Sequence, residues 1–139
     1  MRVVWLYPPN FRKIQEKFKV RGTGVIFTFG KTIYNPDRVI LSKALHAHEE
    51  VHMYQQGDDP WTWWEHYMED PAFRLSQEIP AHKAEYLAKV GTDELYNIAT
   101  RLSGPLYGNL ISFGRAKAIL EHAYMERQIG TDYAITQTL

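Results

Sequence analysis

The most constraining feature of this chain is the pentapeptide His48-Glu49-Glu50-Val51-His52, which has the form H-E-x-x-H. On an α-helix of about 3.6 residues per turn, side chains at positions i and i+4 lie on the same face. Both imidazoles can therefore reach one metal ion, with the carboxylate of Glu49 beside them. Because the chain contains no cysteine, any metal must be held by histidines and carboxylates.

The motif lies in a segment with the properties of a helix. Ser42 is a suitable N-cap, and residues 43–56 contain neither proline nor glycine, so we predict a helix over this range. We measure the angle about the helix axis, at about 100 degrees per residue, with His48 at zero degrees. His52 then falls at about 40 degrees and the apolar Leu45 at about 60 degrees. The two histidines thus occupy the face that should be buried, where metal coordination would satisfy one nitrogen of each ring.

The rest of the chain is predicted to form one α+β domain over residues 1–139, with a two- or three-stranded sheet packed beside a mainly helical core. Alternating apolar residues predict strands at 3–7, 25–29 and 32–34, with a short further piece at 39–41. The other predicted helices cover residues 11–20, 60–68, 72–90, 92–102 and 112–130. We expect a kink or restart near Pro80, a C-cap at Gly91, an N-cap at Thr92 or Asp93, and weak structure in the last nine residues.

A catalytic zinc site needs a third protein ligand and one open position. Glu78, His82 and Glu85 follow in the predicted 72–90 helix at i, i+4 and i+7, so they share one face and each is a candidate. We favour Glu78, which lies 26 residues after His52 (78 − 52 = 26). Glu85 or His82 would then orient a ligand ring through its free N–H.

Two further residues are candidates for catalysis. Glu49 falls at about 100 degrees, beside the histidine pair but not in line with it, which suits a general base rather than a ligand. Tyr107, in a predicted loop, is our first candidate for a donor that stabilises a transition state, and His122 and Arg115 are weaker ones. The strand at 25–29, or its hairpin partner, is expected to bind an extended peptide along its edge.

These motifs carry a resemblance. The run His48-Glu49-Glu50-Val51-His52-Met53-Tyr54-Gln55, followed by Glu78-Ile79-Pro80-Ala81, resembles the gluzincin metallopeptidases. It is similar to short predicted peptidases of phage and bacterial genomes, which carry H-E-x-x-H-x-x-Q and a later E-x-x-A helix. Gly30-Lys31-Thr32-Ile33-Tyr34 also resembles the strand before the zinc helix in that group. The resemblance covers about residues 23–113, and Pro80 departs from the pattern.

The resemblance implies a compact zincin-like fold and a zinc-dependent peptidase. By it, His48, His52 and Glu78 would be the zinc ligands and Glu49 the general base. The substrate would be a peptide or protein. Because 139 residues leave little room for a large substrate-binding lobe, a partner protein that completes the cleft is also expected.

Composition limits the remaining function classes. Lys+Arg and Asp+Glu both number 16, and no basic run occurs, so we expect no nucleic-acid surface. The first apolar run is broken by Pro8-Pro9 and is too short for a signal peptide or a membrane span, which favours a cytoplasmic protein.

Two alternatives stay open from the sequence. In one, zinc only stabilises a small domain that binds a protein partner. In the other, a dinuclear carboxylate site uses Glu49-x-x-His52, but a second Glu-x-x-His is missing because Glu78 and His82 are four residues apart.

Overall fold

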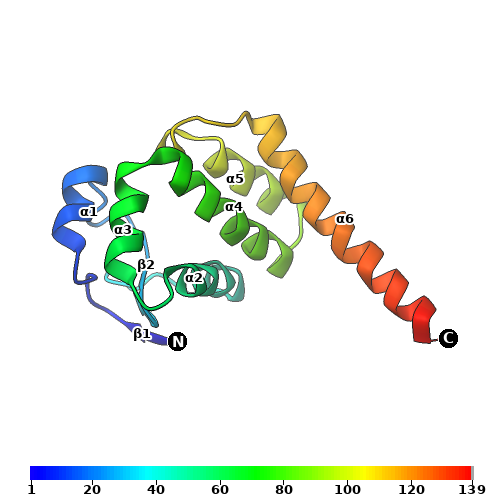
Figure 1. Ribbon diagram of the computed structural model, residues 1–139, viewed down its shortest axis with the longest axis horizontal. Helices are drawn as coiled ribbons and strands as arrows, with labels where there is room; N and C mark the ends of the chain where they lie inside the picture. Colours follow the sequence, from blue (N-terminus) through cyan, green and yellow to red (C-terminus); the bar gives the residue numbers. More distant parts are fainter. Residues whose placement is uncertain (139) are drawn as a thin grey trace.

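The computed structural model describes the backbone of residues 1–138 and the side chains of residues 1–130. This part of the chain forms six α-helices, a 3-10 helix and three strands (Figure 1). The elements are β1 (Arg2–Val4), α1 (Phe11–Phe18), β2 (Phe27–Phe29), β3 (Thr32–Tyr34), α2 (Lys43–Gln56), α3 (Pro60–Glu69), α4 (Pro71–Ala88), α5 (Thr92–Leu102), η1 (Pro105–Tyr107) and α6 (Phe113–Thr138). The predicted α+β class, a small sheet beside a mainly helical core, is confirmed.

The strands form one mixed sheet in the order β1-β3-β2. β2 and β3 make the predicted hairpin, in which Thr28 pairs with Ile33, and Gly30 takes the positive φ of 62° that its turn requires. β1 then pairs with β3 in parallel. The prediction of a strand piece at 39–41 is wrong, because β1 already occupies the free edge of β3.

The helices match the prediction closely, with three corrections. The Ser42 hydroxyl caps α2 as expected, accepting from the amide of Leu45 at 3.1 Å. α4 continues through Pro80 without a restart, because a proline removes only one hydrogen bond and packing against α2 supports the rest. Gly91 is the N-cap of α5 rather than the C-cap of α4, and α6 continues past Gly130 to Thr138.

The core contains two hydrophobic clusters of buried side chains. The first joins α4, α5, η1 and α6 and includes Leu75, Tyr86, Ile98, Leu102, Tyr107 and Leu120. The second joins α1, β2 and α3 and includes Phe11, Ile14, Phe27, Trp63, Trp64 and Tyr67. The motif helix α2 packs against α4, which belongs to the first cluster, and against β2 and α3, which belong to the second.

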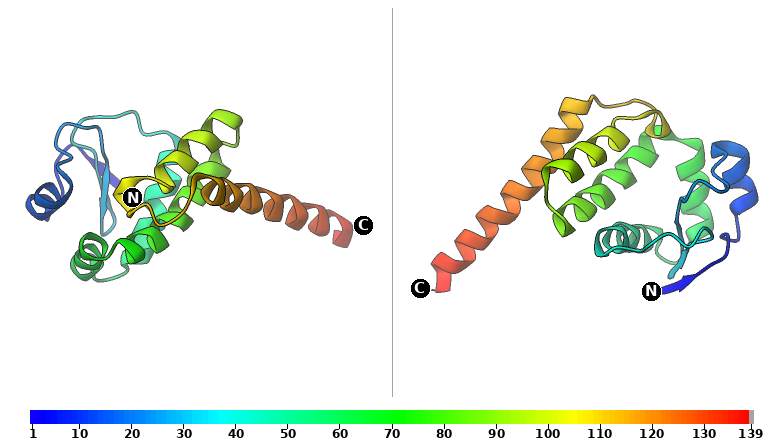
Figure 2. Two further views of the ribbon diagram at one scale, coloured as in Figure 1. Left: turned by 90° about the horizontal axis from the view of Figure 1, so that it is seen from above. Right: turned by 180° about the vertical axis from the view of Figure 1, so that it is seen from behind.

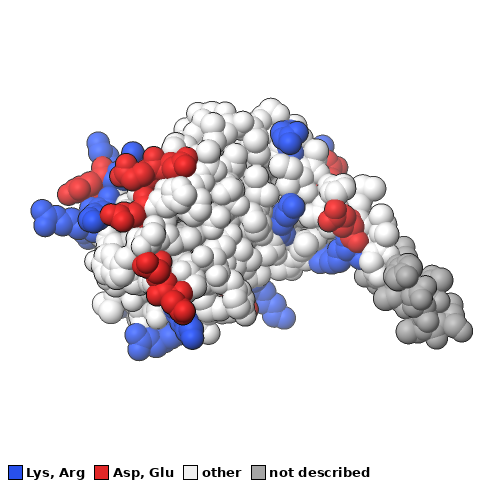
Figure 3. All heavy atoms as spheres, in the orientation of Figure 1, with Lys and Arg blue, Asp and Glu red and all other residues white. Residues whose placement is uncertain are grey.

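The surface has two plain features. The C-terminal part of α6 projects beyond the rest of the molecule in every view (Figures 1 and 2). On the face seen in Figure 3, acidic and basic side chains lie next to one another over α1 and α3, and the centre carries few charges.

Among the helices that the structure describes, none combines the length and apolar character that a bilayer span requires.

Arg74 is a buried cation that joins the two clusters. Its guanidinium donates to the carbonyls of Tyr67 and Met68, near the end of α3, and to the carbonyl of Leu106 in η1, at 2.6–2.9 Å. It also lies 4.7 Å from the ring centre of Phe18. These contacts fix the segment that carries Tyr107 against α3.

We therefore expect Arg74→Ala to lower the free energy of unfolding by about 2–4 kcal/mol, because it leaves buried carbonyls without donors. Chemical denaturation would measure the loss. Arg12→Ala is the matched control, since Arg12 is exposed and its one ion pair among the described residues is with Glu16. It should change stability by less than about 1 kcal/mol. Equal effects of the two substitutions would contradict this role of Arg74.

Candidate metal centre

The motif helix α2 buries an unusual set of side chains. Its fully buried residues are His48, Glu49, His52 and Gln56, and all four are polar. The apolar Leu45 is only partly buried. A helix face of this kind gains little from the hydrophobic effect, and its polar groups cost free energy unless each finds a partner. The groups that contact these buried polar side chains therefore indicate the function of this helix face.

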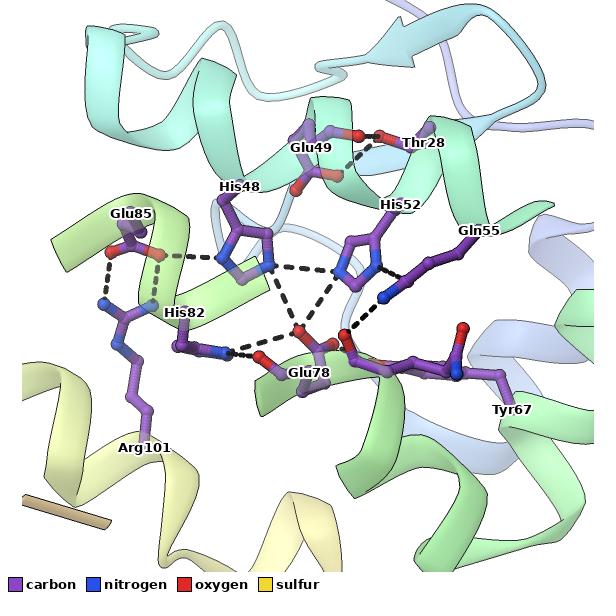
Figure 4. A network of polar contacts seen from close by, with 11 residues as sticks. Thr28, His48, Glu49, His52, Gln55, Tyr67, Glu78, His82, Glu85 and Arg101 are labelled. Atoms are coloured by element: carbon purple, nitrogen blue, oxygen red, sulfur yellow. Dashed lines mark hydrogen bonds and ion pairs between the residues drawn. The ribbon is translucent and has the colours of Figure 1, made fainter. Parts of the chain in front are cut away.

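Three atoms from α2 and α4 converge on one point (Figure 4). Nε2 of His48 and Nε2 of His52 are 3.1 Å apart, and Oε1 of Glu78 lies 3.2 Å from the first and 3.1 Å from the second. A tetrahedral ion with bonds of 2.0–2.1 Å would hold its ligand atoms about 3.3–3.4 Å apart. The three predicted ligands thus stand almost at the separations that such an ion requires.

The outer nitrogen of each histidine carries a proton. Nδ1 of His48 contacts Oε1 of Glu85 at 2.8 Å, and a carboxylate only accepts. Nδ1 of His52 contacts Oε1 of Gln55 at 2.8 Å, and the amide nitrogen of Gln55 donates to the carbonyl of Gln77, so that oxygen also accepts. When each ring carries only this outer proton, both Nε2 atoms offer lone pairs toward each other and toward Glu78. Three acceptors at this distance repel one another unless a cation lies between them.

Glu78 is held by residues from two other directions. The hydroxyl of Tyr67 donates to its second oxygen, Oε2. Nδ1 of His82 donates to the backbone carbonyl of Glu78 at 2.8 Å, and the His82 ring is completely buried. Burial and the neighbouring charge of His48 lower the pKa of His82 to about 4, so this ring is neutral. His82 therefore supports Glu78 from one turn further along the same helix, α4.

The pKa values of His48 and Glu78 also indicate that the cluster is stabilised by positive charge. Burial opposes a proton on His48, but its hydrogen bonds to Glu78 and Glu85 outweigh burial and raise its pKa to about 10. Burial opposes ionisation of Glu78, yet the charge of His52 and a hydrogen bond from His48 hold the pKa of Glu78 well below its usual range. A proton on the histidines thus takes the place that a metal ion would otherwise fill.

A second trio, His48, His82 and Glu85, also has its ligand atoms close together. Glu85 is already bound by Arg101, whose guanidinium nitrogen lies 2.6 Å from Oε2. Burial acts against this carboxylate, but the bonds from His48 and Arg101 lower the pKa of Glu85 to about 2. A second cation beside Arg101 would be repelled, and Glu85 contacts the outer nitrogen of His48, which is the position of a group that orients a ligand ring.

Glu49 is buried next to the trio, and within the described residues no hydrogen bond or ion pair joins its carboxylate to the three ligand atoms. Its Oε2 accepts a 2.6 Å hydrogen bond from the hydroxyl of Thr28 on β2. Burial raises the pKa of Glu49. Its Oε1 has no hydrogen bond, and the fully buried unpartnered atoms of the described residues belong only to Asn10 and His82. This oxygen is therefore open to the adjoining cavity.

That cavity has a volume of about 290 Å³ and brings together the trio, Glu49 and Tyr107. The side chains of Phe18, Ile26 and Trp64 make much of its other wall. Tyr107 is buried, and burial together with the charge of Glu78 raises its pKa, so that its hydroxyl remains a donor.

The two weaker candidates lie elsewhere. Arg115 is exposed near the start of α6, and His122 is exposed and paired with Glu126 at 3.2 Å. Both lie on α6, and neither lines the cavity. Of the three candidate donors, only Tyr107, which ends η1, lines the cavity beside the trio.

Sequence reasoning missed several residues of the site. Thr28, Tyr67 and Arg101 each bind a member of the cluster from a different element, and nothing in their own sequence context marks them. Gln55 belongs to the run that carries the resemblance, but the sequence analysis gave it no role. It lies one turn after His52 at i+3 and accepts from that ring.

Comparisons with protein-family models, with curated proteins and with solved structures found no match for this chain. Its function must therefore be argued from the geometry of the cluster and the cavity.

The pKa of His48 gives a prediction for the metal-free protein. Its value rises from 6.5 to about 10 on folding, so the stabilisation is fully present below pH 6.5 and is lost as the pH rises toward 10. We expect the melting temperature of chelator-treated protein to fall over this range. Zinc-loaded protein should lack this component, because the ion replaces the proton. If the melting temperature depended on pH in the same way with and without zinc, His48 would not be the group responsible.

Proposed function

We propose that this protein is a zinc-dependent peptidase with a compact zincin-like fold. The observation that carries the proposal is the convergence of three acceptor atoms, from His48, His52 and Glu78, at 3.1–3.2 Å beside an open cavity. Zinc favours imidazole and carboxylate ligands in this geometry, and a catalytic site keeps one position free. Each ligand also has an outer partner that fixes its orientation, as working metal sites require.

Bound zinc would supply a Lewis acid that activates water. Oε1 of Glu49 would accept a proton as water attacks the scissile carbonyl carbon, and would pass that proton to the leaving amine as the C–N bond breaks. The hydroxyl of Tyr107 would donate to the carbonyl oxygen as its negative charge develops. These roles suit one oxygen open to the cavity and one buried donor in its wall.

The substrate would be an extended peptide. The carbonyl of Thr28 already accepts from Gln56 and Trp64, so the edge of β2 is closed at this position. Within the described residues, Ile26 makes no main-chain hydrogen bond, and it lines the cavity. Pairing with a peptide is therefore expected just before β2 rather than along it. A partner protein that completes the cleft remains a prediction.

A zinc site that only stabilises the domain is the second candidate. It is favoured by the deep burial of the ligands, which are 8%, 5% and 4% exposed for His48, His52 and Glu78. An ion there would join α2 to α4 and would strengthen their packing.

Hydrolysis of a mixed peptide library, followed by mass spectrometry, tests the proposal. We expect new peptide ends that disappear with chelator and return when zinc is added back. A zinc-loaded protein that melts well above its metal-free form and cuts nothing would favour the stabilising site instead.

A further inference from the structure

Thr28 connects β2 to the motif helix at more than one point. Its carbonyl accepts from Nε2 of Gln56 at 2.7 Å and from Nε1 of Trp64 at 3.0 Å. Oε1 of Gln56 accepts from the amide of Gly30 at 2.8 Å, so the same side chain binds β2 and its turn. The backbone of Thr28 is thereby fixed relative to α2.

The side chain of Thr28 points at the carboxylate of Glu49 (Figure 4). Its hydroxyl lies 2.6 Å from Oε2 and 3.2 Å from the backbone carbonyl of Glu49. Thr28 is 2% exposed and Glu49 is 5% exposed, so no solvent competes for the shorter contact. A buried hydroxyl that donates to a carboxylate at this distance restricts the rotation of that carboxylate.

We infer that Thr28 is a positioning residue that holds Oε2 of Glu49 and leaves Oε1 as the oxygen that transfers the proton. The inference rests on the proposed function for its catalytic meaning. The two oxygens differ in the structure, since Oε2 has a donor and Oε1 has none and opens to the cavity. A carboxylate free to rotate would spend much of its time with neither oxygen aimed at the reacting water, and such misplacement slows a reaction strongly.

The activity test compares Thr28→Val with Thr28→Ser. Valine has the shape of threonine but no hydroxyl, so we expect kcat to fall about ten- to hundredfold with KM nearly unchanged. Serine restores the hydroxyl and should recover most of kcat. Zinc content should stay the same in both variants, because Thr28 contacts no ligand of the trio. Thr32→Val on the neighbouring strand is the control, since the Thr32 hydroxyl makes no hydrogen bond in the described residues.

A second measurement does not depend on hydrolysis. Unfolding of wild type, Thr28→Val, Glu49→Met and the double variant, at one fixed free zinc concentration, forms a double-mutant cycle. We expect the double variant's unfolding constant to differ at least about tenfold from the product of the single effects, as for a hydrogen bond to a charged group. A product within about twofold would overturn the inference. So would full kcat in Thr28→Val.

The two tests separate the possible failures. If wild type cuts no peptide but the cycle shows coupling, the peptidase proposal fails while Thr28 still positions Glu49. If peptides are cut and the cycle shows no coupling, the peptidase stands and the role of Thr28 is refuted.

Discussion

Purified protein is expected to contain one zinc ion per chain, and Glu78→Ala is expected to lose it. Oε1 of Glu78 lies within 3.1–3.2 Å of both facing histidine nitrogens, so its removal takes away one of three ligands. It also leaves the hydroxyl of Tyr67 without its acceptor. Elemental analysis of dialysed protein would give the zinc content directly, and titration with a competing chelator would give the affinity.

Glu85→Ala is the matched comparison, because it removes a carboxylate from the same helix face but not from the trio. It should keep the ion and weaken zinc affinity about 10–100-fold, as the loss of an outer partner does. Loss of zinc in Glu85→Ala but not in Glu78→Ala would move the site to His48, His82 and Glu85. Two iron ions per chain would support the dinuclear alternative.

Glu49→Gln is expected to abolish most hydrolysis and to keep the zinc. The amide keeps the size of the carboxylate and can still accept from Thr28, but it cannot take a proton from water. Loss of a general base costs about 10²–10⁴-fold in rate. Initial rates on the best peptide from the library would measure the effect, with zinc content determined on the same samples.

Glu50→Gln is the control for this substitution. Glu50 is the neighbouring carboxylate on α2, lies toward solvent and is paired with His46 at 3.7 Å, so its loss should leave the rate within about twofold. Full activity in Glu49→Gln would remove the role assigned to Glu49. A large loss in Glu50→Gln would mean that the wrong carboxylate had been chosen.

Local signals were sufficient for the motif helix. Ser42 and the absence of helix breakers set α2 to residues 43–56, and the spacing of His48 and His52 puts both rings on one face. These are effects within a few residues along the chain, so the sequence contains all the information they need. The hairpin of β2 and β3 followed from its turn glycine in the same way.

Local signals failed where competition between segments decided the outcome. Gly91 and Pro80 both marked the predicted ends or breaks of helices, yet the first caps α5 and the second lies inside α4. Packing of α4 against α2 outweighs the one hydrogen bond lost at Pro80. β1 occupies the sheet edge that residues 39–41 had been expected to fill, and the two segments could be compared only in three dimensions.

The amino-acid sequence by itself determined that two histidines and a glutamate share one helix, and that three further candidates share another. Only the tertiary structure shows that Glu78 is the one of Glu78, His82 and Glu85 whose carboxylate lies beside both facing histidine nitrogens, because their spacing gives all three the same helix face. This arrangement depends on how α4 crosses α2, and on Tyr67 and Arg101, which bind Glu78 and Glu85 from other elements of the chain. Contacts at such sequence separation follow from packing of the whole domain, which no short pattern records.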